Sequence, residues 1–238
     1  MKRAIKRTLL FIIVTGITVA GIFTYEGYKL YEEAINETSI KEMQEQIKND
    51  TENYTEIEEV PEIYLDALVA VEDRRFYLHS GVDIISIGRA IITDIKEMEL
   101  VEGGSTVTQQ LAKNTYFTQK KELTRKIAET FTAIKYEKEL SKEEILELYI
   151  NTCYYGDGYY SIADAALGYF DKEVEDMDTY ECTLLVGIPN APSVYAPTKN
   201  PELAKERQMQ VLNKMLDQGY ITEDEVEKLS KEEYDNGK

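Results

Sequence analysis

A glutamate occupies a position that a helical pattern reserves for an apolar side chain, within V-E-D-R-R-F-Y-L-H-S-G at residues 71–81. The members of this stripe follow the i, i+3, i+4, i+7, i+11 spacing of one helix face: Leu65, Leu68, Val69, Glu72 and Phe76. A carboxylate on an apolar face loses solvation and becomes a better proton acceptor, which is the property of a general base. A buried ion pair with a following basic side chain would explain the glutamate equally well; the candidates are Arg74, Arg75 and His79.

A second segment combines glycine, hydroxyl, amide and cationic groups: G-G-S-T-V-T-Q-Q-L-A-K-N at residues 103–114. Its two glycines permit unusual backbone angles and the close approach of a ligand. Lys113 begins a local reversal of charge in an acidic chain, which continues with Lys120, Lys121, Arg125 and Lys126. These groups together suit phosphate oxygens, although the G-K-[ST] step of a P-loop is absent. The alternative is a glycine turn that opens a polar helix with a solvated basic face.

Glu129 follows this basic cluster, on a helix expected from residue 123 to residue 136. The apolar stripe of that helix is Leu123, Ile127, Phe131 and Ile134. Glu129 lies about 200° around the helix from Ile127, on the face shared with Arg125 and Lys126. An exposed i, i+4 pair with Arg125 would have the same spacing, so the spacing alone does not make Glu129 catalytic.

Composition describes an acidic globular chain of 238 residues with a formal net charge of −18 at pH 7. This charge argues against a nucleic acid partner, which demands a basic face, but leaves room for a local basic pocket. The two cysteines, Cys153 and Cys182, lack the spacing of metal ligands. We expect free, partly buried thiols, while a disulfide between them remains permitted by an extracytoplasmic location.

The N-terminus has the pattern of a membrane anchor. Lys2, Arg3, Lys6 and Arg7 come first, an uncharged stretch runs from Thr8 to Tyr25, and acidic residues begin at Glu26. The stretch is long enough to cross a bilayer as a helix, and the charge order predicts a cytoplasmic N-terminus with the body outside. A signal peptide cleaved near Ala20 is the alternative.

The rest of the chain predicts helices and no strand. Residues 26–60 are polar and are expected to form a juxtamembrane stalk or a loosely packed helix. Capping patterns occur at Ser141 with Glu144 and at Thr222 with Glu225, and a helix is expected from Pro201 until Gly219. Thr179 is expected to cap a helix that Pro189 stops.

The sequence allows more than one environment for each of two segments. The isoleucine-rich segment 84–100 predicts either a central buried helix or an interfacial helix that dips into lipid headgroups. Four tyrosines surround a Gly-Asp-Gly turn in Y-Y-G-D-G-Y-Y at residues 154–160. Tyrosines suit sugars, but packing is the expected role for most of them.

Five motifs in this order resemble the peptidoglycan glycosyltransferases, glycosyltransferase family 51, in their monofunctional, membrane-anchored form. VEDRRFYLHSG resembles the family's E-D-x-x-F-x-x-H-x-G motif, GGSTVTQQ its G-x-S-T-x-T-Q-Q motif, and RKIAE its R-K-x-x-E motif. Residues 142–151 and 154–170 resemble the fourth motif, and LVGIPNAPSVYAP the fifth. The resemblance covers the chain from about Pro61 to Gly219. It implies a mainly α, lysozyme-like, two-lobed glycosyltransferase domain after an N-terminal transmembrane helix.

The resemblance also implies site residues. Glu72 would be the base that takes a proton from the 4-hydroxyl of the acceptor sugar, and Glu129 the second essential glutamate, near the donor pyrophosphate. Substrate-binding positions carried over from the motifs are Asp73, Phe76, His79, Ser105, Thr106, Gln109, Gln110, Lys113, Asn114, Lys121, Arg125 and Lys126. No cofactor and no protein metal site are expected, although a divalent cation, Mg²⁺ or Mn²⁺, would fit beside Glu129 and the pyrophosphate.

The expected activity is polymerisation of lipid II into β-1,4-linked glycan at the cell membrane, with inversion and release of undecaprenyl pyrophosphate. The expected partners are lipid II, the nascent lipid-linked glycan, the lipid bilayer and other cell-wall synthesis proteins, and the family's smaller lobe would dip into the membrane through segment 84–100. The expected divisions are a basic tail (1–7), a transmembrane helix (8–25), a stalk (26–60) and the glycosyltransferase domain (61–238). The alternatives are a non-catalytic lipid-pyrophosphate-binding scaffold and a lysozyme-like wall hydrolase.

Overall fold

A computed structural model describes residues 2–97, 104–117 and 123–234, with side chains described at 5–90, 104–117 and 123–234. The described residues form helices and no strand, which confirms the mainly α prediction. The α-helices are α1 (Lys2–Glu37), α2 (Ile40–Asp50), α3 (Glu62–Glu72), α4 (Ile84–Glu97), α5 (Val107–Tyr116), α6 (Leu123–Glu139), α7 (Lys142–Ile150), α8 (Ile162–Phe170), α9 (Thr179–Gly187), α10 (Pro192–Tyr195), α11 (Pro201–Gln218) and α12 (Glu223–Ser230). Short 3₁₀ helices are η1 (Ile57–Glu59), η2 (Phe76–Leu78), η3 (Val174–Asp176) and η4 (Ile188–Asn190).

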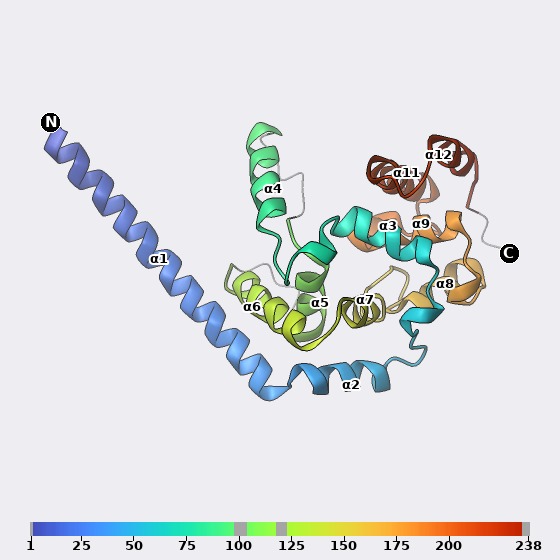
Figure 1. Cartoon of the computed structure of the whole chain (residues 1–238), viewed down its shortest axis with the longest axis horizontal. Helices are drawn as coiled ribbons and strands as arrows, with labels where there is room; N and C mark the ends of the chain where they lie inside the picture. The colour runs from blue at the N-terminus through green and yellow to red at the C-terminus, as the bar shows by residue number, and fades with distance from the viewer. Residues whose placement is uncertain (1, 98–103, 118–122, 235–238) are drawn as a thin grey trace.

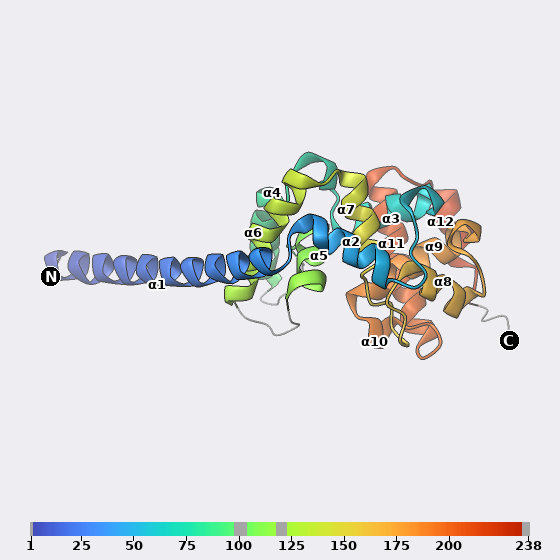
Figure 2. The ribbon, with the colours of Figure 1, turned by 90° about the horizontal axis from the view of Figure 1, so that it is seen from below.

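The helices form two lobes on a long N-terminal helix (Figure 1). α4, α5 and α6 gather on the side of the body nearest α1, and α3 gathers with α8, α9, α11 and α12 on the other side. Figure 2 shows α1 leaving the body as one continuous helix. Its apolar part is long enough to cross a membrane and is not buried against any other part of the described chain. The helix continues past the predicted end at residue 25 because residues 27–31 pack against α6.

The predicted helix ends are mostly confirmed. Ser141 and Thr222 each form a capping box, with Glu144 and Glu225, at the starts of α7 and α12. Gly219 ends α11 in the left-handed conformation (φ 80°), where a residue with a side chain would be strained. One cap differs from the prediction, because α9 is capped by Asp178, whose Oδ1 accepts from the Glu181 amide at 2.9 Å. Thr179 is instead the first residue of that helix.

Residues 26–60 are packed on the body, unlike the expected stalk. Ile40 is fully buried and Ile47 is nearly so, both on α2 and both within the main hydrophobic core. The segment after α2 is held by Asn151, whose side chain accepts from the Thr55 amide at 3.0 Å and donates to the Thr55 carbonyl at 2.8 Å. Residues 40–60 therefore belong to the folded body, because all their apolar side chains lie in the core or pack against it: Ile40, Met43, Ile47, Tyr54, Ile57 and Val60.

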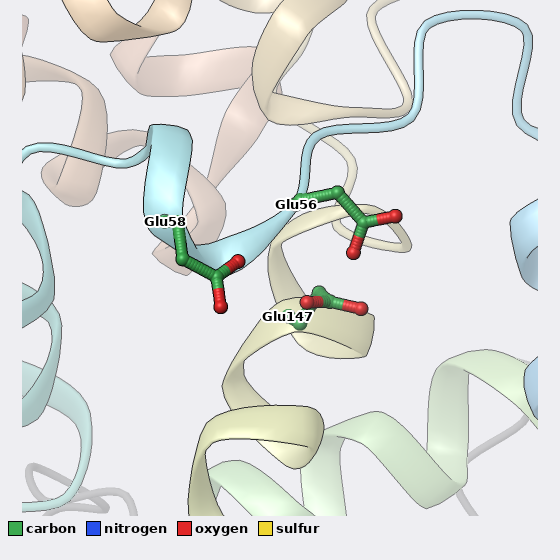
Figure 3. A group of neighbouring side chains, drawn as sticks. All are labelled: Glu56, Glu58 and Glu147. Carbon is green, nitrogen blue, oxygen red and sulfur yellow. The ribbon is translucent and has the colours of Figure 1, made fainter.

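A second tie to this segment is Glu147, a buried carboxylate on α7. It accepts from the Tyr54 hydroxyl at 2.6 Å and the Ile57 amide at 3.1 Å, and it pairs with Lys48 Nζ at 2.8 Å. Figure 3 shows Glu56 and Glu58 beside it, with oxygens of the three carboxylates within 4.8 Å of one another. Because Glu147 already has a cation and two donors, its bonds account for its burial without a metal ion.

Two other expectations concern the surface and the cysteines. At the start of α4, Ile84 and Ile85 are 79% and 59% exposed, so this end of the helix is not the buried central helix that the composition allowed. Cys153 and Cys182 are both free, as expected, with no disulfide between them, and both are buried. Burial raises the pKa of each thiol to about 12, which makes both poor nucleophiles at neutral pH.

The Glu147 network predicts a pH-dependent stability. Burial alone would raise the pKa of Glu147, but hydrogen bonds from Lys48, Tyr54 and the Ile57 amide hold it below the ordinary value of 4.5. The stabilisation is therefore fully present above pH 4.5 and is lost as the pH falls through the lowered value. We expect Glu147→Gln to lower the free energy of unfolding by about 1–3 kcal/mol at pH 7, and by progressively less in acid. Urea unfolding between pH 7 and pH 3 measures this, with exposed Glu58→Gln as the matched control; a pH-independent difference would contradict it.

Candidate active site

Glu72 is the last residue of α3, and its side chain remains 13% exposed. Its Oε2 accepts a hydrogen bond from Gln110 Nε2 at 2.7 Å, and its Oε1 lies 3.9 Å from Arg207 Nη2. Neither Arg75 nor His79 pairs with it, in contrast to the ion pair that the sequence allowed. The carboxylate is thus oriented by an amide and keeps one oxygen outside any short hydrogen bond between described residues.

Two of the three basic candidates after Glu72 pair with aspartates instead, and the third, Arg74, is exposed. Arg75 Nε lies 3.1 Å from Asp83 Oδ2, and His79 Nε2 lies 2.8 Å from Asp73 Oδ2. Hydrogen bonds from Ser86 and the amides after Asp83 outweigh its burial and, together with Arg75, hold its pKa below the usual range. Because Arg75 and His79 have these partners, the polar neighbours of Glu72 are Gln110 and Arg207 instead.

The carbonyl end of α3 is held by α11. Gln218 Nε2 donates to the Ala70 carbonyl at 2.9 Å, and Lys214 Nζ donates to the Val71 carbonyl at 3.2 Å. These are carbonyls that a helix end leaves without an intrahelical partner, and a cation there also complements the helix dipole. The contacts fix the last turn of α3, and with it the backbone of Glu72.

Four of the predicted substrate-binding residues are buried and connect the two lobes. Asp73 Oδ2 also accepts from the Val107 amide at 3.1 Å, which ties the end of α3 to the start of α5. Thr106 caps α5 in a capping box with Gln109, and its hydroxyl donates to the Gly81 carbonyl at 2.7 Å. Phe76 is fully buried, and its ring centroid lies 6.1 Å from that of His79 in an edge-to-face arrangement. These side chains, with His79, position the site elements rather than line an open surface.

α5 carries the predicted residues that remain partly open. Gln110 donates to Glu72 and accepts from the Tyr149 hydroxyl at 3.2 Å, so its amide orientation is set by two partners. Asn114 donates to the Thr152 carbonyl at 3.3 Å. Lys113 is partly exposed on the same helix, and no hydrogen bond or ion pair of its ammonium is found with another described residue. Its charge is therefore available to a ligand.

Glu129 is the centre of a second cluster and is only 1% exposed. It pairs with Arg125, and its Oε2 lies 3.1 Å from Lys126 Nζ. Lys126 Nζ also donates to Ser105 Oγ at 2.5 Å, which brings the hydroxyl-rich segment onto α6. The exposed i, i+4 pair that the sequence allowed is therefore replaced by a buried carboxylate between two cations. Lys121, predicted for the same cluster, lies outside the described residues.

The burial of Glu129 was missed because α6 has partners on both sides. The apolar stripe identified in the sequence faces α1, where Ile127 meets Gly27 and Phe131 meets Tyr28. The opposite side of α6 packs on α5 through small and polar residues, and its buried members are Ala128, Glu129, Thr132, Ala133 and Tyr136. A helical wheel locates one apolar face and gives no sign of a second, polar contact.

The residues around Glu129 do not form a cage for a divalent cation. Glu129 is the one carboxylate in the described cluster, and each of its oxygens faces a cationic side chain. Both oxygens of Glu129 therefore already have cationic partners, and the Mg²⁺ or Mn²⁺ ion predicted beside Glu129 and a bound pyrophosphate stays a prediction.

Arg207 is a site residue that the sequence reading missed. It lies on α11, is buried, and approaches Glu72 while Nε donates to the Gly187 carbonyl at 3.4 Å and Nη1 donates to Gln210 at 2.8 Å. The sequence did contain a sign of it, because Arg207 stands among the core-facing positions of α11, which include Ala204, Gln208, Val211 and Met215. A charged residue at a core-facing helix position is also what drew attention to Glu72.

The arrangement suits base catalysis on an anionic substrate: an oriented, partly open carboxylate on α3, and a helix carrying cations and hydroxyls beside it. A family model described as Transglycosylase matches residues 36–216. The chain belongs to this transglycosylase family.

The relatives agree with this assignment. The chain is 46% identical over 180 residues to penicillin-binding protein 1A of Neisseria flavescens and 47% identical over 170 residues to penicillin-binding protein 1F of Bacillus subtilis. These matches cover 76% and 71% of the chain but 23% and 24% of the relatives, so the chain spans about a quarter of their length. It is also 42% identical over 177 residues to a protein of Cupriavidus necator provisionally named a transglycosylase, covering 74% of the chain and 76% of that protein.

The link between the lobes predicts a large effect at Asp73. We expect Asp73→Ala to lower the free energy of unfolding by about 2–4 kcal/mol, because it leaves the Val107 amide and His79 without their buried acceptor. Asp66→Ala, on α3 and partly exposed, is the matched control and should change stability by less than about 0.5 kcal/mol. Urea unfolding of both variants checks this, and equal effects would contradict the link.

Proposed function

We propose that this protein is a peptidoglycan glycosyltransferase that polymerises lipid II into β-1,4-linked glycan strands with inversion. Its membership of the transglycosylase family supports a lipid-linked glycan substrate. The observation that carries the proposal is the state of Glu72: Gln110 orients one of its oxygens, and the other lies 3.9 Å from Arg207, beyond hydrogen-bond distance. A carboxylate in that state can accept a proton from a sugar hydroxyl.

In the proposed reaction, Glu72 takes the proton of the acceptor's 4-hydroxyl as that oxygen attacks the anomeric carbon of the growing chain. The O–H bond breaks, the new glycosidic bond forms, and the bond to the pyrophosphate oxygen breaks on the opposite face. Gln110 supports this step by fixing one oxygen of Glu72, so that the other can face the acceptor. Arg207 lies 3.9 Å from the other oxygen and places positive charge beside the site.

The leaving pyrophosphate needs positive charge where its own charge develops. Arg125 and Lys126, joined to Glu129 and Ser105, supply prearranged donors, and Lys113 adds an ammonium on the neighbouring helix. In this proposal Glu129 acts by positioning the two cations, which would otherwise repel each other. Prearranged donors stabilise the transition state without the cost of reorganisation.

The proposed location is the cell membrane, with α1 crossing it once and the body outside the cytoplasm. The basic residues that precede the apolar stretch and the acidic ones that follow it support this orientation. The proposed partners are lipid II, the nascent lipid-linked glycan, the bilayer and other cell-wall synthesis proteins. The exposed Ile84 and Ile85 at the start of α4 are compatible with the interfacial role suggested for residues 84–100.

The base assignment predicts that Glu72→Gln loses polymerisation. The amide keeps the size of the side chain but cannot take a proton, so the rate should fall by at least about 10²-fold. Purified full-length protein with labelled lipid II in vesicles measures polymer formation, and Glu62→Gln at the exposed start of the same helix is the matched control.

The same assay separates the alternatives. A scaffold would bind lipid II without polymer in the wild type, and a hydrolase would shorten preformed glycan instead of lengthening lipid II. Normal polymerisation by Glu72→Gln would exclude Glu72 as the base.

The donor assignment predicts a weaker substrate interaction for Lys126→Gln. Loss of the ammonium removes a charge-assisted contact to pyrophosphate, and KM for lipid II should rise about tenfold while folding is retained. Lys138→Gln, in the exposed last turn of the same helix, should leave KM unchanged. Steady-state polymerisation with varied lipid II checks both variants. An unchanged KM for Lys126→Gln would contradict its donor role.

A further inference from the structure

The candidate membrane helix α1 makes a close contact with α6, which we call the anchor joint. α6 also carries Arg125, Lys126 and Glu129, which we call the donor cluster. The members of the anchor joint are Gly27, Tyr28 and Tyr31 on α1 and Thr124, Ile127 and Phe131 on α6. A Cβ atom added at Gly27 would lie 2.6 Å from Ile127 Cβ and 2.9 Å from the Thr124 carbonyl oxygen. The Phe131 ring centroid lies 5.3 Å from that of Tyr28 and 5.8 Å from that of Tyr31. Only glycine allows the helices to approach this closely.

The joint lies close to the end of the apolar stretch. Tyr25 closes that stretch, and tyrosines prefer the interface between membrane and water. α1 is unbroken from Lys2 to Glu37, so Gly27 stands only about 3 Å further along the helix axis than Tyr25. With α1 in a bilayer, the joint therefore falls at the level of the lipid headgroups.

The joint and the donor cluster share one short part of α6. Thr124 and Ile127 contact α1, while Arg125, Lys126 and Glu129 stand between and beside them on the side that meets Ser105. Pyrophosphate attached to a membrane lipid is also confined to headgroup depth. The continuous helix thus holds the cations at the depth where the phosphates of the substrate lie.

We infer that the anchor joint sets the height of the donor site above the bilayer, and that Gly27 is a positioning residue for the reaction. This inference rests on the proposed function and deepens it. A change in height should impair the use of substrate embedded in a bilayer, while substrate free in solution can reach the site at any height.

The first test inserts four alanines between Tyr25 and Glu26, which lifts the joint by about 6 Å without changing any of its contacts. The full-length protein is assayed with undecaprenyl lipid II in vesicles and with a short-chain, water-soluble lipid II analogue. We expect at least about a tenfold loss with the vesicle substrate and a change of less than about twofold with the soluble one. The same four residues inserted between Lys2 and Arg3 serve as the matched control and should change neither rate.

The second test breaks the joint itself. Gly27→Leu should show the same selective loss with vesicles, whereas Gly21→Leu, at a glycine with no atom within 4 Å of an added Cβ, should not. Thermal unfolding shows whether each variant keeps its fold. Equal activity of the wild type and the lifted variant on vesicles would overturn the inference, and so would an equal loss on both substrates. A wild type inactive on both substrates would instead contradict the proposed function.

Discussion

The carboxylate of Asp73 joins the two halves of the site. It accepts a hydrogen bond from the Val107 amide and pairs with His79, so the end of α3 and the start of α5 are held together. Glu72 comes directly before Asp73, and Gln110 lies in the first turns of α5. The contact between Glu72 and Gln110 therefore depends on a buried bond next to it in the sequence, and α11 supports the end of α3 through Gln218, Lys214 and Arg207.

Buried contacts also hold the charged groups of the site. The chain is strongly acidic, yet three cations of the site, Arg125, Lys126 and Arg207, are held by buried or partly buried carboxylates. Glu129 brings Arg125 and Lys126 together, and its near-complete burial strengthens both interactions. Burying a carboxylate costs free energy unless its partners are well placed, and here each oxygen of Glu129 has a cationic partner.

α6 links this site to the membrane helix. One side of α6 meets α1 through aromatic rings and a glycine, and the other meets α5 through small residues and Glu129. The donor cluster is therefore built on a helix whose position depends on the anchor as well as on the body. Residues 26–60 extend this connection, since α2 and the segment after it pack into the core through Ile40 and Asn151.

The sequence by itself determined the helices, most of their caps, the apolar anchor and the family, because these depend on local patterns and on motifs in a fixed order. It also identified Glu72 as unusual, since a carboxylate interrupts an otherwise apolar face. Only the tertiary structure decided the partners: that His79 and Arg75 pair with aspartates, that Gln110 and Arg207 approach Glu72, and that Glu129 is buried. The physical reason is that burial and pairing depend on contacts between helices distant in sequence. A wheel drawn for α6 alone therefore placed Glu129 on an outer face that α5 in fact covers.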